Sequence, residues 1–171
     1  MTSRSLSDAE IANVLERLTS LRDKCLFILG VKTGFRISEI LSLTPADVQG
    51  DTITVRRCNM KGKRSSRSVP LHPIAKAAVK AYLDALGCPP LRLFPMTRQH
   101  ARRIISGAAK AAGLAGCIST HSMRKTFGMR VYQVTGKNVV AAQRALGHAS
   151  LASTSHYLSI GQDEVDAAIL A

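Results

Sequence analysis

The chain has 171 residues, of which 46% are hydrophobic, so it is long enough for one compact domain and too apolar for a disordered segment. It carries 24 lysines and arginines against 11 acidic residues, a formal net charge of +13. No apolar run reaches the roughly 18 residues that a membrane-spanning helix needs, and the first ten residues lack the apolar stretch of a secretory signal. The composition therefore excludes a membrane protein, and we expect a cytoplasmic one.

The four cysteines, Cys25, Cys58, Cys88 and Cys117, lie about thirty residues apart. This spacing is too wide for paired zinc knuckles and shows no disulfide framework. We expect reduced thiols, most of them buried, as in a cytosolic protein.

The positive charge is concentrated in the middle of the chain. Residues 51–158 hold eighteen basic and two acidic side chains, residues 1–50 hold six of each, and residues 159–171 hold three acidic and no basic ones. Such a segment repels itself on folding, and a polyanion such as nucleic acid relieves the repulsion. The alternative is a solvated basic surface without a specific partner. Only three tyrosines and four phenylalanines occur, which argues against base stacking and favours contacts to a duplex backbone.

The predicted elements of the first seventy residues change from helical to extended. Ser7 and Glu10 form a capping-box pattern at the start of a helix. A second helix is expected from about Leu21 to Lys32, where Gly34 breaks it, and Pro45 marks a turn or a new helix start. A short helix is expected at 36–43, and alternating β-branched residues predict strands at 51–58 and 67–71, joined by a basic turn at 61–63.

The rest of the chain is helical in pattern. We expect helices at 72–86, 97–112, 121–134, 137–146, 151–158 and 162–171. The predicted fold class is therefore α+β, mainly α-helical with one small antiparallel sheet near residues 50–71.

Three short patterns hold residues suited to phosphate chemistry. Arg36 and Glu39 are spaced so that the carboxylate braces the guanidinium, which then offers its planar fork to a phosphate. His121 and Arg124 have the same spacing and combine proton handling with charge stabilisation. Tyr157 follows His148 by nine residues. Each pattern alone is as well explained by a surface ion pair, an ordinary helix face or a core tyrosine.

Taken in order, the segments TGFRISE, MKGKRSSRSVPL, HSMRKTFGMR and LGHASLASTSHY resemble the boxes of the tyrosine recombinases, the phage integrase family. The resemblance extends from about Leu6 to the C-terminus. It implies the catalytic-domain fold of that family, over residues 1–171. It also implies a prokaryotic cell, a phage or a plasmid as the source, and a mobile genetic element as a context.

The resemblance implies a site-specific recombinase or integrase that cleaves and rejoins double-stranded DNA. Tyr157 is then the nucleophile that forms a 3′-phosphotyrosine and leaves a 5′-hydroxyl, whereas Tyr82 and Tyr132 lie outside the box. Arg36 and Arg124 clamp the non-bridging oxygens, in keeping with the charge that the transition state gains there. His121 and His148 donate hydrogen bonds, and the base for the phenol stays open between them.

The family assigns protonation of the leaving oxygen to a hairpin lysine. Lys61 is the first candidate and Lys63 the rival. Glu39 matches the acidic residue that supports the site. We expect no metal and no other cofactor, because arginine and histidine supply the positive charge and the phosphotyrosine conserves the energy of the phosphodiester.

Other basic residues are expected to contact the DNA backbone: Arg56, Arg57, Lys63, Arg64, Arg98, Arg102 and Arg103. If about six of them neutralise phosphates, log K falls against log salt with a slope of about −5. Residues 162–171 carry an apolar face, and by resemblance this segment joins protomers into a tetramer on DNA; packing on its own domain is the alternative.

Most members of the family carry an N-terminal DNA-binding domain of roughly a hundred residues that closes a clamp on the duplex. This sequence starts where the catalytic domain starts, so we expect that domain to be absent from a fragment or from a naturally short recombinase. Two rival functions remain: a type IB topoisomerase with the same phosphotyrosine chemistry, and a DNA-binding regulator without activity.

Overall fold

The computed structural model describes residues 3–59 and 66–158. They fall into two compact units, one that ends at Phe127 and one that begins at Gly128. The boundary lies inside the helix α6 (Thr120–Val134). Each unit is described by itself.

The first unit begins with two helices whose ends match the sequence signals. α1 (Asp8–Arg17) starts at the Ser7 capping box, in which the Ser7 hydroxyl accepts from the Glu10 backbone and Glu10 accepts from the Ser7 backbone. α2 (Leu21–Thr33) ends at Gly34, whose φ of 63° lies in the left-handed region. Both boundaries are as predicted, apart from one residue at the end of α2.

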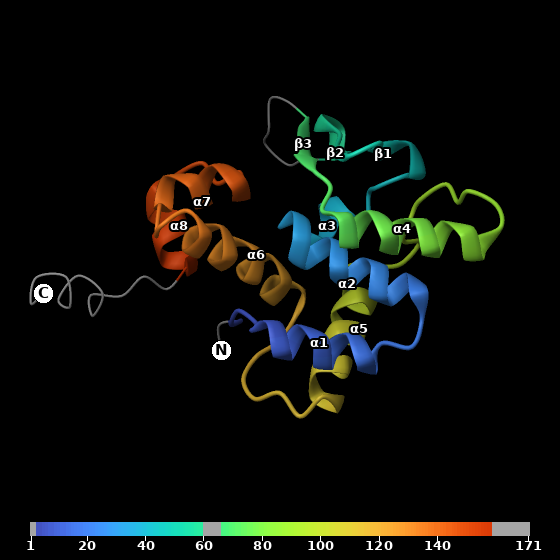
Figure 1. The fold of residues 1–171 in the computed structure, drawn as a ribbon, viewed down its shortest axis with the longest axis horizontal. Coiled ribbons are helices and arrows are strands. Elements are labelled where there is room, and N and C mark those ends of the chain that lie inside the picture. Colours follow the sequence, from blue (N-terminus) through green and yellow to red (C-terminus); the bar gives the residue numbers. More distant parts are fainter. Residues whose placement is uncertain (1–2, 60–65, 159–171) are drawn as a thin grey trace, which may run out of the picture. The chain divides into compact units, whose positions relative to one another are not determined.

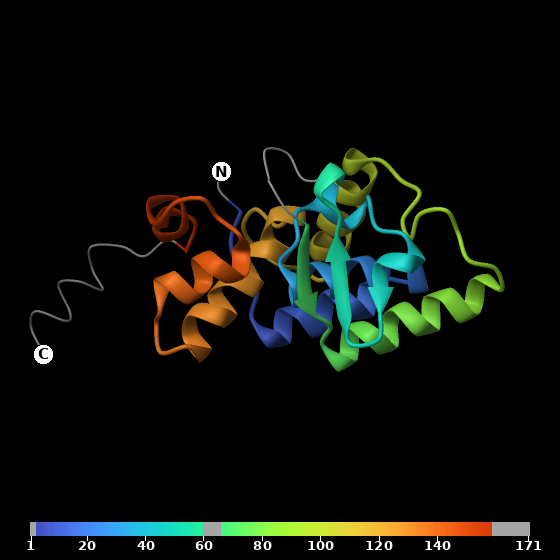
Figure 2. The same ribbon diagram turned by 90° about the horizontal axis from the view of Figure 1, so that it is seen from above.

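A short helix and a small sheet follow. α3 (Ile37–Ile40) is half the predicted length, since the chain turns at Leu41 and a 3₁₀ turn at Pro45–Asp47 comes next. β1 (Val48–Gln49), β2 (Thr52–Val55) and β3 (Arg67–Pro70) pair antiparallel in the order β1-β2-β3, as Figure 2 shows. β2 is shorter than predicted because a 3₁₀ turn at Arg57–Asn59 ends it, and β1 was not predicted.

Two further helices complete this unit together with the start of α6. α4 (Pro73–Leu86) packs beside α2, and α5 (Arg98–Ala111) packs beside α1 (Figure 1). One cluster joins the inner face of the sheet to α2 and α4 through Ile53, Val55, Leu26 and Val79. A second cluster holds α1, α2, α5 and Met123 of α6 together. The predicted class, mainly helical with a small antiparallel sheet, is confirmed.

The second unit contains the last turns of α6, α7 (Val139–Leu146) and α8 (Leu151–Leu158). α7 starts at Asn138, whose side chain accepts from the Ala141 backbone, and ends at Gly147. Its small core is formed by Tyr132 and Ala142 with Met129, Val131, Val139 and Tyr157. The helix expected at 162–171 lies outside the described residues.

The cysteines depart from the expectation of mostly buried thiols. All four are free, but Cys58 and Cys88 are exposed and Cys117 is partly so. Cys25 alone is fully buried, and burial raises the pKa of its thiol to about 12. The reason is topological: Cys58 lies in the 3₁₀ turn after β2 and Cys88 in the loop after α4.

Candidate functional site

Arg36 lies at the start of α3 and is braced by a buried carboxylate. The Arg36 backbone N–H donates to Glu39 Oε2 at 2.7 Å, and Arg36 Nη1 donates to Glu39 Oε1 at 3.0 Å. The Arg36 side chain is 44% exposed, whereas that of Glu39 is 4% exposed. The predicted brace is therefore present, and it leaves part of the guanidinium open to a ligand.

Arg124 reaches the same loop from α6. Only 3% of Arg124 is exposed, and its Nη1 donates to the carbonyl of Gly34, two residues before Arg36. Gly34 can lie this close to the Phe127 ring because it has no side chain. A Cβ added at Gly34 would lie 2.2 Å from Cδ1 of Phe127. Arg124 is thus bonded to the same segment, between α2 and α3, in which Arg36 lies.

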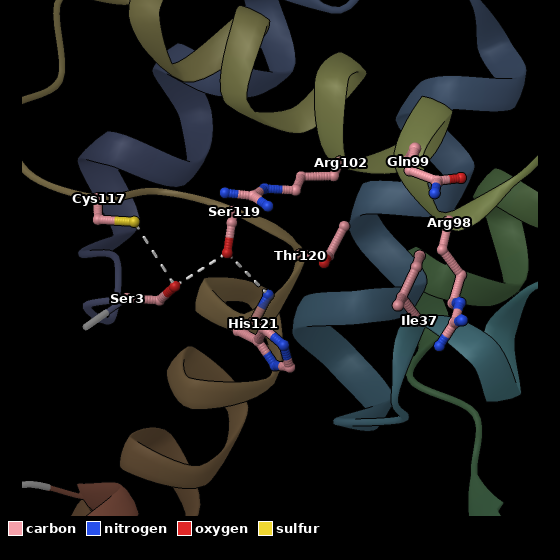
Figure 3. A pocket seen from close by; sticks show the side chains of 9 residues that line it. All are labelled: Ser3, Ile37, Arg98, Gln99, Arg102, Cys117, Ser119, Thr120 and His121. Carbon is pink, nitrogen blue, oxygen red and sulfur yellow. Dashed lines mark hydrogen bonds between the residues drawn. The ribbon is translucent and has the colours of Figure 1, made fainter. Parts of the chain in front are cut away.

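His121 is exposed at the start of α6, one helical turn before Arg124. Its backbone N–H donates to Ser119 Oγ at 3.3 Å, and Ser119 Oγ lies 2.9 Å from Ser3 Oγ (Figure 3). The buried Ser122 closes the turn, because its hydroxyl accepts from the Ser119 backbone. The start of α6 is thereby tied to the N-terminal segment, which the sequence patterns did not reveal.

A hollow of about 440 Å³ opens beside His121. Figure 3 shows Arg98, Gln99 and Arg102 reaching it from α5, with Ile37 of α3 on one side. The remaining lining residues are Ser3, Cys117, Ser119 and Thr120. Two arginines and several hydroxyl groups suit the hollow to anionic oxygens.

The other basic candidates have different surroundings. Arg56 Nε donates at 2.6 Å to Asp47, a buried carboxylate that also accepts from the backbone and hydroxyl of Thr44. Burial raises the pKa of Asp47, but the bonds from Thr44 and Arg56 outweigh it and leave the pKa lowered. Arg56 therefore has a structural ion pair in addition to any DNA contact. Arg57 and Arg103 are exposed, and Lys61, Lys63 and Arg64 lie outside the described residues.

In the second unit, His148 follows the left-handed Gly147 that ends α7. Its Nδ1 lies 3.0 Å from Thr154 Oγ1, and the Thr154 hydroxyl donates to the carbonyl of Ser150 at 3.3 Å. The contact with Thr154 fixes the orientation of the His148 imidazole.

Tyr157 is placed beside the same imidazole. The rings of His148 and Tyr157 lie 5.2 Å apart at 87°, an edge-to-face contact, and Tyr157 packs on the Tyr132–Ala142 core. Thr154 is fully buried, and the sequence patterns did not indicate it. The signal available in the sequence was a hydroxyl residue six positions after His148, which follows the glycine that ends α7. Within this unit the structure therefore brings the predicted histidine and tyrosine together.

Two negative findings concern the described part of the chain alone. Over residues 3–59 and 66–158, no helix is long and apolar enough to cross a membrane. Over the same residues, no group of three or more histidine, cysteine or acidic side chains is arranged as a metal site.

Comparison with known sequences decides the family. Residues 5–163 match the sequence profile of the phage integrase family. The chain belongs to this family. The integrase-family chain is 36% identical over 154 residues to the probable integrase/recombinase YoeC of Bacillus subtilis, covering 86% of the chain and 82% of YoeC. It is 30% identical over 182 residues to the tyrosine recombinase XerD of Bradyrhizobium diazoefficiens, covering 95% of the chain and 56% of XerD.

Solved structures have the same fold as this integrase-family chain. The crystal structure of XerA recombinase matches with a TM-score of 0.80 and 25% identity, over 97% of the chain and 64% of XerA. XerH recombinase, in a post-cleavage complex with its palindromic difH substrate, matches with a TM-score of 0.76 and 24% identity, over 99% of the chain and 53% of XerH. The chain thus spans little more than half the length of XerD and XerH. The fold is that of the tyrosine recombinase catalytic domain.

Proposed function

We propose that the chain is a site-specific recombinase or integrase that cleaves and rejoins double-stranded DNA through a covalent bond to Tyr157. The observation that carries the proposal is that Arg124 is bonded to the loop between α2 and α3 in which Arg36 lies, braced by Glu39. Family membership supports it, since the matched relatives are named recombinases and integrases.

The two arginines have distinct parts in the proposed reaction. Both stabilise the charge that builds on the non-bridging oxygens of the scissile phosphate. Arg124 is fixed by burial and by its bond to the Gly34 carbonyl. Arg36 is more exposed, and Glu39 limits the orientations of its guanidinium. A preset pair of this kind avoids the cost of ordering the side chains during the reaction.

The nucleophile and its proton acceptor are assigned to Tyr157 and a histidine. Oη of Tyr157 attacks the phosphorus, the bond from phosphorus to the 5′-oxygen breaks, and the phenolic proton passes to His121 or His148. The contact between Nδ1 of His148 and the Thr154 hydroxyl orients the imidazole, which accepts a proton when it is neutral and donates to the phosphate when it is charged. His148 also lies in edge contact with Tyr157.

Protonation of the leaving 5′-oxygen is assigned to Lys61, with Lys63 as the alternative. The departing oxygen takes a proton from the ammonium group and becomes the free 5′-hydroxyl. The reverse reaction, in which a 5′-hydroxyl attacks the phosphotyrosine, rejoins the DNA and returns the phenol. No outside energy source is required, because the phosphodiester energy is retained in the covalent bond.

Binding of the duplex is assigned to basic side chains around this site. Arg98 and Arg102 line the hollow beside His121, while Arg57 and Arg103 are exposed. The XerH structure, which holds a DNA substrate, supports DNA as the partner. These contacts are to the sugar–phosphate backbone, so they predict a strong dependence of affinity on salt.

Assembly on DNA is assigned to residues 162–171, which lie outside the described residues. We expect these residues to hold protomers together in a tetramer. Residues 1–171 are proposed to act as a catalytic domain, in the cytoplasm of a bacterial cell where chromosomal, plasmid or phage DNA is accessible. Deleting 162–171 is expected to spare strand cleavage and weaken assembly, as measured by light scattering of the DNA complex; unchanged assembly would refute this assignment.

Trapping the covalent intermediate tests the proposed function. The probe is a pool of duplexes with randomised sequence and a single nick, because loss of the short fragment beyond the nick prevents rejoining. The wild-type chain is expected to form a protein–DNA adduct that survives denaturing gels, and sequencing the trapped DNA gives its target. Tyr157→Phe is expected to form none, whereas Tyr82→Phe, a buried ring stacked on Phe94 in the first unit, retains it. DNA binding without any adduct would contradict the proposal and support an inactive regulator.

A further inference from the structure

Arg67 belongs to the segment MKGKRSSRSVPL, but none of the roles proposed above falls on it. It is the first residue of β3 and pairs in register with Val55 of β2. Its guanidinium carbon lies 5.0 Å from the centroid of the Phe35 ring, over the ring face. Phe35 is fully buried and directly precedes Arg36 in the chain. The strand is therefore joined to the arginine loop by a cation–π contact.

Arg67 also shares an electrostatic environment with the Arg36–Glu39 pair. Burial lowers the pKa of the Arg67 guanidinium, attraction to Glu39 raises it, and repulsion from Arg36 lowers it. A guanidinium stays protonated in proteins. The lowered pKa therefore reflects that the positive charge of Arg67 lies near the positive charge of Arg36 and is partly shielded from water.

The charges around Glu39 show what Arg67 adds. Both carboxylate oxygens of Glu39 accept from Arg36, so Arg36 and Glu39 by themselves are a neutral pair. A neutral pair attracts a phosphate weakly. The charges of both residues act on Arg67, so the three side chains together carry two positive charges and one negative charge.

We propose that Arg67 is a positioning residue for Arg36: its stack on Phe35 fixes the backbone from which Arg36 extends, and its charge offsets Glu39. This inference rests on the proposed function, because it assumes that Arg36 meets the scissile phosphate. Arg67 acts through Arg36 and does not itself touch the phosphate. Both parts, the planar stack and the charge, are needed for the full effect.

Single-turnover cleavage rates on the trapped duplex test this proposal. Arg67→Met removes the charge and the planar group but retains length, and Arg67→Lys retains the charge alone. We expect Arg67→Met to slow cleavage by about 10- to 100-fold, as is typical for residues that orient a catalytic group, and Arg67→Lys to recover part of that loss. Arg17→Met, which removes the same charge from an exposed position of α1, is the control and is expected to change the rate less than about 2-fold.

A double-mutant cycle separates positioning from general packing. In an Arg36→Lys background, Arg67→Met is expected to cost little further rate, because the residue through which it acts is already impaired. On a duplex with a neutral methylphosphonate at the scissile position, the Arg67→Met defect is expected to shrink to less than about 3-fold, because less charge must be stabilised. If Arg67→Met fails to fold by circular dichroism, Arg67→Gln takes its place in the same cycle.

The outcomes distinguish the two proposals. Equal losses from Arg67→Met in both Arg36 backgrounds and on both DNAs, or an unimpaired Arg67→Met, would overturn the role of Arg67 and leave the recombinase function intact. A wild-type chain that forms no adduct overturns the proposed function, and the role of Arg67 with it.

Discussion

Arg124 and Tyr157 are held by very different surroundings. Arg124 sits in the first unit, 3% exposed, on a helix whose Met123 packs into a cluster shared by α1, α2 and α5. Tyr157 sits in the second unit, on the eight-residue helix α8, and packs on a small core whose buried members among the described residues are Tyr132 and Ala142. Local stability follows the number of buried apolar contacts. Changes in the arginine region are thus expected to affect stability and rate together, and changes near Tyr157 mainly rate.

The largest effect is expected from removing the buried arginine. Arg124→Ala takes away a transition-state cation and leaves the Gly34 carbonyl without this donor, so adduct formation is expected to fall by on the order of 10³-fold, or about 4 kcal/mol of barrier. Its melting temperature is expected to fall as well. Arg36→Ala is the matched comparison, with a similar loss of rate but a smaller loss of stability, because the Arg36 side chain is 44% exposed and Glu39 retains its bond from the Arg36 backbone. Equal melting temperatures for the two variants would contradict the difference drawn between buried and exposed arginines.

Gly34→Ala is expected to come next and to act on stability first. The new methyl group would meet Phe127 at 2.2 Å, and φ of 63° disfavours any side chain. A loss of about 3 kcal/mol in unfolding free energy is expected from denaturant titration. Gly87→Ala isolates the backbone part, since Gly87 has a φ of 71° but no atom within 4 Å of an added Cβ, and about 1 kcal/mol is expected there. Equal losses at both glycines would show that Phe127 moves aside freely.

Thr154→Val tests the other half of the comparison, the surroundings of Tyr157 in the second unit. It removes the hydroxyl that holds Nδ1 of His148 at 3.0 Å while retaining the volume of the side chain. We expect cleavage to slow by about 10-fold, or about 1.4 kcal/mol, with a smaller effect on stability. Ser153→Ala, which removes an exposed hydroxyl bonded to Ser150, is the control. A Thr154→Val chain with a wild-type rate would show that His148 needs no such anchor.

The smallest effect concerns the N-terminal ion pair and depends on pH. The hydrogen bond from Arg4 is the main cause that lowers the pKa of Glu10 to about 2. A lowered carboxyl pKa contributes stability above the ordinary value near 4.5, and this contribution is lost as the pH falls through about 2. Because the pair is partly exposed and a glutamine still offers an acceptor for the capping box, Glu10→Gln is expected to cost about 1 kcal/mol or less at pH 7.

Thermal melts of the wild type and Glu10→Gln between pH 7 and pH 2 measure this contribution. The two curves are expected to approach each other towards acid. A difference that stays constant over the whole range would exclude the carboxylate charge as its source.

The sequence predicts most helices because their ends are set by local chemistry. Ser7 with Glu10, and the glycines at 34, 87 and 147, end or begin helices where the pattern predicts it. The length of α3 escaped prediction because the chain turns at Leu41, where the Ser42 hydroxyl donates to the Glu39 carbonyl. β1 has two residues and is defined by its pairing with β2 alone. Such features depend on contacts between segments, which a periodic pattern does not record.

The sequence supplied ionisable candidates for the site but not the groups that hold them. The Arg36–Glu39 brace follows from local spacing and is confirmed. The Gly34 carbonyl, the Thr154 hydroxyl and the Arg67 stack depend on main-chain geometry or on a distant strand. Lys61 and residues 162–171 lie outside the described residues, so their assignments stay predictions.

The central claim is that Tyr157 is the nucleophile that attacks DNA. Mapping the covalent bond between the protein and the DNA tests this claim most directly. The adduct trapped on the nicked duplex is digested with nuclease and protease, and the peptide that retains a nucleotide is sequenced by mass spectrometry. We expect a phosphodiester bond from the 3′-end of the DNA to Oη of Tyr157, and its loss in Arg36→Ala and Arg124→Ala. A nucleotide on Tyr82, Tyr132 or a serine, or a bond to the 5′-end, would contradict the account.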